Sequence, residues 1–133
     1  MSEPLFWKID CYRLPVPDLE AALVFYREKL GHELIWRTDA AAGLRLPGDD
    51  HELVLQTERP GQETDLLVES VPAAVARFVA AGGRVIAEPF DIQIGKCAVV
   101  ADPFGNVLVM LDMSKGRLIT DSEGNVVGNE VAD

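Results

Sequence analysis

The chain has 133 residues and a formal net charge of −10, with 48% apolar and 26% charged residues. This composition is typical of one globular domain, and the negative charge disfavours nucleic acid and anionic membranes as partners, because both bind basic surfaces. No segment approaches the apolar length that spans a bilayer, and the first four residues do not resemble a signal peptide, so we expect a cytoplasmic protein. Its two cysteines, Cys11 and Cys97, are too few for a disulfide framework.

The first half of the chain has the pattern of a strand, a helix and three more strands. Apolar and β-favouring residues predict the first strand over residues 5–16. Asp18 is placed to cap a helix whose apolar residues recur at helical spacing, and Gly31 is placed to end it in the left-handed conformation. Three further strands, separated by turns, are predicted over 32–37, 43–46 and 52–57.

The second half repeats this order. A strand over 63–68 leads to Ser70 as a helix cap, and Gly82 stops the helix. When residues 18–35 are superposed on 69–86, acid, helix, glycine and strand coincide, and Gly31 falls on Gly82. A duplicated β-α-β-β-β unit explains this order better than chance does. The remaining strands are predicted over 84–87, 96–101 and 107–111.

Two motifs give the chain a specific resemblance. One is Val16-Pro17-Asp18-Leu19-Glu20-Ala21-Ala22-Leu23-Val24-Phe25-Tyr26 with Leu30-Gly31, and the other is the turn Asp102-Pro103-Phe104-Gly105-Asn106 before an apolar strand. With these, the chain resembles the vicinal oxygen chelate superfamily, which includes glyoxalase I, extradiol dioxygenases, and fosfomycin and bleomycin resistance proteins. The resemblance implies an α+β fold in which two tandem β-α-β-β-β modules form a curved mixed sheet around a central cavity. Within one domain of residues 1–133, the first module is expected over about 5–58, the second over about 62–113, and a hairpin-like tail over 114–133.

Metal-dependent members of this family hold a divalent ion on four inward side chains, mostly His and Glu. Carried over to this chain, with the third within a residue or two, these positions are Cys11, Gln56, Glu63 and Val109. Valine has no donor atom and glutamine is a poor ligand for zinc, iron, manganese or nickel. The chain has two histidines: His32 follows the end of the first helix, and His51 sits in an acidic turn. We therefore expect no metal site and no cofactor.

Strand alternation predicts which residues line the cavity. The expected ligand-binding residues are Cys11, Arg13, Gln56, Glu63, Cys97 and Val109. They form a mostly apolar site with a few polar anchors, which suits a small organic molecule. Gln56 has a claim to function because a buried amide needs partners and a ligand can provide them. Alternatives stay open for three residues. Arg13 either anchors a ligand or pairs with an acid at the rim, and Cys11 is expected to be a small buried residue rather than a nucleophile. Trp36 belongs either to the core or to an aromatic wall.

Two classes of function remain. The first is a metal-independent protein, resembling the bleomycin resistance branch, that sequesters or senses a small hydrophobic or aromatic compound. The second is a divergent glyoxalase-like lyase or dioxygenase-like enzyme, either metal-dependent or using Cys11, Arg13 or Glu63, although no catalytic residue can be assigned. The missing metal donors favour the first class.

The tail and the resemblance together bear on association. Leu118-Ile119 and Val126-Val127 flank a turn-forming segment, which predicts a small hairpin. A two-stranded hairpin is marginal on its own, so we expect it to pack on the body of the protein or on a second subunit. Family members are commonly homodimers, and a homodimer without nucleic-acid or membrane partners is expected here.

Overall fold

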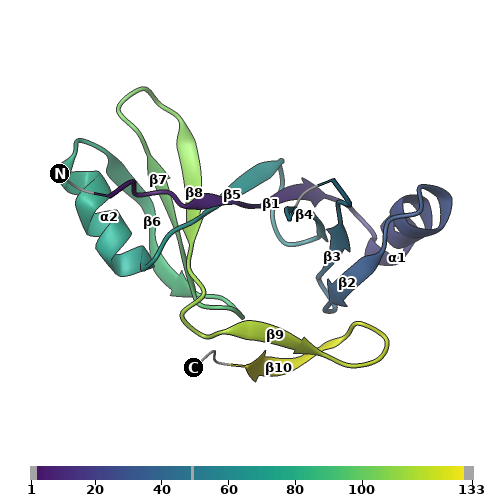
Figure 1. Ribbon diagram of the computed structural model, residues 1–133. Coiled ribbons are helices and arrows are strands. Elements are labelled where there is room, and N and C mark those ends of the chain that lie inside the picture. Colours follow the sequence, from purple (N-terminus) through teal and green to yellow (C-terminus); the bar gives the residue numbers. More distant parts are fainter. Residues whose placement is uncertain (1–2, 49, 131–133) are drawn as a thin grey trace. The chain divides into compact units, whose positions relative to one another are not determined.

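The computed structural model describes residues 3–48 and 50–130, which divide into two compact units (Figure 1). Unit one contains residues 10–63 and 118–128, and unit two contains the described residues among 1–9, 64–117 and 129–133. No helix in the described part of the chain has the length and apolar character needed to cross a membrane.

The helices and strands come in the order expected from the sequence, with two successive β-α-β-β-β sets. The α+β class and the paired modules are therefore confirmed. The bounds are β1 (Lys8–Pro15), α1 (Leu19–Leu23), η1 (Val24–Lys29), β2 (Leu34–Arg37), β3 (Ala41–Arg45), β4 (Glu52–Gln56), β5 (Glu63–Leu67), α2 (Val71–Ala80), β6 (Arg84–Asp91), β7 (Lys96–Ala101), β8 (Val107–Leu111), β9 (Arg117–Thr120) and β10 (Val126–Glu130).

Unit one contains a mixed sheet in the strand order β2-β3-β4-β1. β1 runs parallel to β4, and β3 is antiparallel to both β4 and β2. Helix α1 begins where Asp18 accepts backbone N–H groups from Glu20 at 3.0 Å and Ala21 at 3.3 Å, as the sequence predicts. One side of the sheet and the helix share an apolar core of Leu19, Ala22, Leu23, Ala42, Leu44 and Leu55, with Leu14, Val16, Tyr26, Leu34 and Leu53 packed on it.

The first helix departs from the expected α-helix in its second half. After α1 ends at Leu23, the chain continues as the π-helix η1, and the Leu30 N–H donates to the Phe25 carbonyl at 3.0 Å. The residues at this change are β-branched or aromatic, and such side chains crowd the preceding turn of an α-helix. The wider π turn gives them room. Gly31 ends the helix with φ at +84°, as predicted.

The strands of unit two follow the order β5-β8-β7-β6, with β5 parallel to β8. Ser70 caps α2 by accepting the Ala73 N–H at 3.4 Å. Helix and sheet enclose a core of Val68, Val71, Ala74, Val75, Ala98, Val100 and Met110. β6 runs four residues beyond its predicted end, because its two register shifts accommodate Pro89 in a strand at the end of this order.

Two turns of the chain share one design, Asp-x-x-Gly-Asn. In residues 102–106 the Asp102 carboxylate accepts the backbone N–H groups of Phe104 at 2.8 Å and Asn106 at 2.9 Å. In residues 121–125 the Asp121 carboxylate accepts those of Glu123 and Asn125, both at 2.9 Å. In each turn the Asn side chain also donates to the Asp, and the glycine has a positive φ. The second turn connects β9 and β10, which pair as a two-stranded sheet.

A buried carboxylate ties together three parts of unit two. Asp112 is 1% exposed, and its oxygens accept N–H groups from Val71 at 2.8 Å and Lys96 at 2.9 Å. They also accept the Ser114 N–H at 3.2 Å and its hydroxyl at 2.8 Å. A Cβ at Gly95 would lie 2.3 Å from Oδ1, so this position requires glycine. Burial raises the pKa of Asp112, but these hydrogen bonds outweigh it and hold the pKa below its usual range.

Asp112→Asn should destabilise the protein by ~2–4 kcal/mol at neutral pH, because charge-assisted hydrogen bonds are lost and an amide N–H₂ must face N–H donors. A depressed folded-state pKa means that the stabilisation exists above the pKa of unfolded aspartate, about 4, and is lost as pH falls through the folded value. Urea unfolding from pH 7 to 3 should therefore show a smaller acid-induced loss in the variant. The exposed Asp39→Asn is the control and should leave stability unchanged.

Candidate functional site

The sheet of unit one has a second apolar surface on the side away from α1. Cys11, Ala41 and Val54 are buried there, and Trp36 packs against them. We call these four residues, from four different strands, the Trp36 face. Leu14 and Leu55 lie in the cluster with α1, on the other side of the sheet. The alternation predicted for β1 and β4 is therefore observed.

The indole ring of Trp36 is held from two directions. Its Nε1–H donates to a Glu52 carboxylate oxygen at 2.7 Å. Across the β2–β3 pair it faces Gly43, where a Cβ would lie 2.1 Å from Nε1. Only glycine lets the ring lie this close to the backbone of β3. Both contacts fix the ring in one orientation.

An irregularity in β2 decides which side Trp36 occupies. The β2–β3 register shifts between Leu34 and Trp36. Without a shift, residues two apart would share a side of the sheet. Instead, Leu34 packs in the cluster with α1, whereas Trp36 lies with Cys11 on the other side.

A chain of alternating charges continues along β1 beside this face. Arg13 donates through Nη2 to Glu58 at 3.0 Å, and its Nε lies 3.6 Å from a Glu63 oxygen. Arg59 donates two hydrogen bonds to the Glu63 carboxylate, from Nε at 3.0 Å and from Nη2 at 2.8 Å. The Arg13 and Glu63 side chains are only 12% and 13% exposed. Of the two alternatives for Arg13, the structure shows the ion pair, yet its buried Nε–H has no hydrogen-bond acceptor within the described residues.

Gln56 is fully buried and uses its amide within its own loop. Its Oε1 accepts the N–H groups of Glu58 and Arg59, both at 2.8 Å, and its Nε2 donates to the Arg59 carbonyl at 2.8 Å. Backbone groups of the protein thus satisfy the hydrogen-bonding groups of the Gln56 amide, which we had expected a ligand to satisfy. The unpaired-amide argument for Gln56 is lost, although a ligand contact there stays a prediction. The loop also borders a hollow of about 330 Å³, lined by residues 15–17 and 56–60.

The two remaining candidates lie in unit two. Cys97 on β7 and Val109 on β8 are buried, 3% and 8% exposed. Cys97 pairs across the strands with Leu111, and Val109 pairs with Val99. None of these four belongs to the apolar core shared with α2, which contains their neighbours Ala98 and Met110. Both residues therefore lie on the side of the sheet away from α2.

Comparison with known proteins agrees with this architecture. Residues 8–110 match the family described as the Glyoxalase/Bleomycin resistance protein/Dioxygenase superfamily. The chain belongs to this superfamily.

Two curated relatives, from Mycobacterium bovis and Mycobacterium tuberculosis, are each named "Putative glyoxylase CFP32". Each is 36% identical over 107 residues, which cover 71% of this chain and 39% of the relative. The chain thus spans about two fifths of the length of these relatives.

Solved structures with the superfamily fold include a methylmalonyl-CoA epimerase from Mycobacterium tuberculosis, at 17% identity and a TM-score of 0.68, which covers 86% of this chain and 93% of that one. Another is homoprotocatechuate 2,3-dioxygenase from Brevibacterium fuscum, at 24% identity and a TM-score of 0.60, which covers 83% of this chain and 37% of that one. At these identities the likeness concerns the fold alone.

The superfamily's metal positions in this chain do not suit a divalent ion. Glu63 is neutralised by the Arg59 fork, with Arg13 close by, and the amide oxygen of Gln56 already accepts two N–H groups. Val109 offers no donor. No group of three or more His, Cys, Asp or Glu side chains that could hold a metal was found in the described ranges. Glu63 and Gln56 thus have their oxygens engaged in ion pairs and hydrogen bonds of the protein.

Sequence reasoning missed three participants of this site. Glu58 and Arg59 were not among the predicted site residues, and Glu52, although expected on the same side of its strand as Gln56, was not foreseen as the partner of the Trp36 indole. One signal was present for Arg59: it stands four residues before Glu63, although that spacing predicts an ion pair only within a helix.

Gln56→Ala should lower the free energy of unfolding by ~2–4 kcal/mol, because three hydrogen bonds are lost and the N–H groups of Glu58 and Arg59 lose their acceptor. Chemical denaturation measures this change. Thr57→Ala, at an exposed neighbour with one side-chain hydrogen bond, is the control and should cost about 1 kcal/mol or less. Equal stability of Gln56→Ala and wild type would show that the loop does not need the amide.

Proposed function

We propose that this chain is a cytoplasmic, metal-independent small-molecule-binding protein of the glyoxalase/bleomycin resistance type, which sequesters or senses a small hydrophobic or aromatic compound. One observation carries the proposal. The apolar Trp36 face lies beside Arg13, whose buried Nε–H lacks an acceptor within the described residues. An unsatisfied buried donor is costly, and a ligand oxygen would satisfy it.

The Trp36 face supplies the apolar part of such a site. In the parallel β1–β4 register, Cys11 is level with Glu52 and Arg13 is level with Val54. The Trp36 ring is fixed at Glu52, so little freedom is lost when an aromatic compound stacks on it. We assign Cys11 and Val54 as apolar contacts and Arg13 as the polar anchor. Gln56, Glu63, Cys97 and Val109 remain predicted contacts.

The second function class, an enzyme, is favoured by one finding. The curated relatives at 36% identity carry the name "Putative glyoxylase CFP32". Against it stands the chemistry of the donor set, because the Glu63 carboxylate is held by Arg59 and is a poor base or ligand while that fork persists. We therefore rank binding above catalysis.

Ligand binding can be read from Trp36 itself. Trp7 and Trp36 are the only tryptophans, and Trp7 is 56% exposed, so Trp7→Phe leaves Trp36 as the sole reporter. Titration with 1-anilinonaphthalene-8-sulfonate, 3,4-dihydroxyphenylacetate and bleomycin should give saturable quenching by at least one probe. Adding the Arg13→Gln substitution should lower the affinity for that probe about tenfold, because one charge-assisted hydrogen bond is lost. Arg45→Gln, at an exposed arginine paired with Glu33, should leave its affinity unchanged.

Two results would contradict the binding proposal. One is the absence of saturation with all three probes, and the other is equal affinity for the Arg13→Gln and Arg45→Gln proteins. Metal content of protein purified without chelator separates the two function classes, and we expect it to be well below one equivalent. One tightly held equivalent would favour the enzyme.

We also propose a homodimer. In the tail, Ile119 is 42% exposed and Val127 is 63% exposed, so part of each predicted apolar pair is left uncovered by the chain itself. Mass measurement in solution should give twice the chain mass for the full-length protein, and deletion of 117–133 should shift it toward the monomer. A full-length monomer would refute the dimer, and a truncated protein that stays dimeric would show that the tail is not part of the interface.

A further inference from the structure

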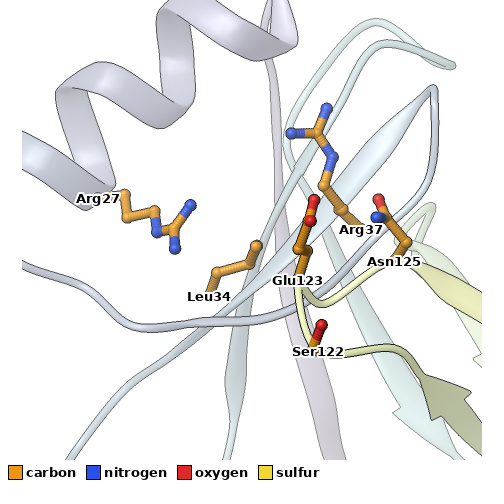
Figure 2. A pocket seen from close by; sticks show the side chains of 6 residues that line it. All are labelled: Arg27, Leu34, Arg37, Ser122, Glu123 and Asn125. Atoms are coloured by element: carbon orange, nitrogen blue, oxygen red, sulfur yellow. The ribbon is translucent and has the colours of Figure 1, made fainter.

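A second hollow in unit one lies at a place that the proposed function does not use. Figure 2 shows it among side chains from η1, β2 and the turn between β9 and β10. Its volume is about 360 Å³, and we call it the arginine pocket; its lining is Arg27, Leu34, Arg37, Ser122, Glu123 and Asn125. Leu34 belongs to the apolar cluster with α1, whereas Trp36 is on the opposite side of the sheet. The pocket is therefore separate from the Trp36 face.

Two guanidinium groups give this pocket a positive lining in an acidic protein. The chain has 22 acidic and 12 basic side chains, so most arginines have an acid at hand. Arg37 forms an ion pair with Glu20 on α1. For the Arg27 side chain no hydrogen bond or ion pair is found within the described residues, and Figure 2 shows it extending from the helix toward the pocket. A guanidinium that is not engaged by protein presents a fork suited to carboxylate or phosphate oxygens.

The turn between β9 and β10 forms the wall of the pocket that contains Ser122 and Asn125, and it is fixed to β2. The Arg37 N–H donates to the Gly124 carbonyl at 2.8 Å, and Arg37 and Asn125 form a β-bridge. A Cβ at Gly124 would lie 3.1 Å from a Leu34 methyl carbon, so the turn sits close against β2. The Asp121 carboxylate fixes the shape of the turn from within. The hydroxyl of Ser122 and the amide of Asn125 thereby line a preformed wall.

We propose that the arginine pocket binds the anionic head group, carboxylate or phosphate, of a small organic acid. Arg27 supplies the free positive charge, Arg37 adds a guanidinium that also pairs with Glu20, and Ser122 and Asn125 add neutral hydrogen-bonding groups. Leu34 provides an apolar floor for the rest of the ligand. The volume is at the lower end of that of small-molecule sites, which suits a compact ligand rather than a nucleotide or a peptide.

Glu123 sets a limit on the charge of this ligand. Its carboxylate belongs to the lining, so the lining side chains carry two positive charges and one negative. Because Glu20 already pairs with Arg37, the Arg27 charge is the one that a monoanion neutralises, whereas further negative charge meets Glu123. Removing the Glu123 charge should therefore tighten anion binding, while removing the Arg27 charge should weaken it. Opposite effects from two residues of one pocket are difficult to obtain from non-specific charge.

The test uses the full chain labelled with ¹⁵N and follows the arginine Nε–H signals at constant ionic strength. Benzoate and inorganic phosphate are titrated separately, to distinguish a carboxylate from a phosphate head group. At least one should shift the Arg27 and Arg37 signals saturably. Arg27→Gln should weaken its binding about tenfold, and Glu123→Gln should tighten it about threefold. Arg77→Gln is the matched control, an exposed helical arginine on α2 of unit two, and should change nothing.

The proposal is overturned if neither anion gives saturable shifts at Arg27 and Arg37, or if Arg27→Gln and Arg77→Gln weaken binding equally. Shifts shared by all arginine signals would indicate charge screening alone and would equally refute it. Because this readout does not involve Trp36, failure here leaves binding at the Trp36 face standing, and failure of the fluorescence titration leaves the arginine pocket standing.

Discussion

The buried carboxylate of Asp112 is the interaction on which unit two depends most directly. It lies at the end of β8, and its oxygens reach the first turn of α2, the start of β7 and the segment after β8. These parts are far apart in the sequence, and each has a backbone N–H for which Asp112 is the acceptor. Four hydrogen bonds offset the cost of burying the charge, and this is why the pKa is lowered despite burial. One side chain thereby joins helix, sheet and loop.

Unit one uses charge differently, and the difference bears on function. Glu63, which the resemblance predicts at or near a metal-ligand position, has its oxygens committed to Arg59. A carboxylate held by a guanidinium fork is a weaker ligand and a weaker base than a free one, because both roles require the electrons that the fork already engages. The same network places Arg13 at the edge of an apolar face. The same residues thus bear on both proposed function classes, which is consistent with a fold that hosts many functions.

Two turns of the chain have the same internal hydrogen bonds but different surroundings. The Asp-x-x-Gly-Asn turns at 102–106 and 121–125 have nearly the same hydrogen bonds, since an aspartate side chain can organise its own loop. The first leaves Phe104 86% exposed, whereas the second packs on β2 and lines a pocket. Their local chemistry is alike. Their different roles come from what lies beside them.

The sequence by itself determined the fold class, the order of the elements, the caps at Asp18 and Ser70 and the stops at Gly31 and Gly82. These depend on local patterns, namely period-two and helical spacing, capping oxygens and glycine's freedom at positive φ, and such patterns can be recognised without knowing distant neighbours. It also placed Cys11 and Val109 correctly on the sides of the sheets away from the helices. Only the tertiary structure decided that Trp36 lies beside Cys11, because a register shift in β2 overrides simple alternation. It also decided that Gln56 serves its own loop and that Glu63 is held by Arg59. Hydrogen bonds and ion pairs form only where the distance between two segments is right to within a few tenths of an ångström, and residue spacing along the chain does not encode that distance.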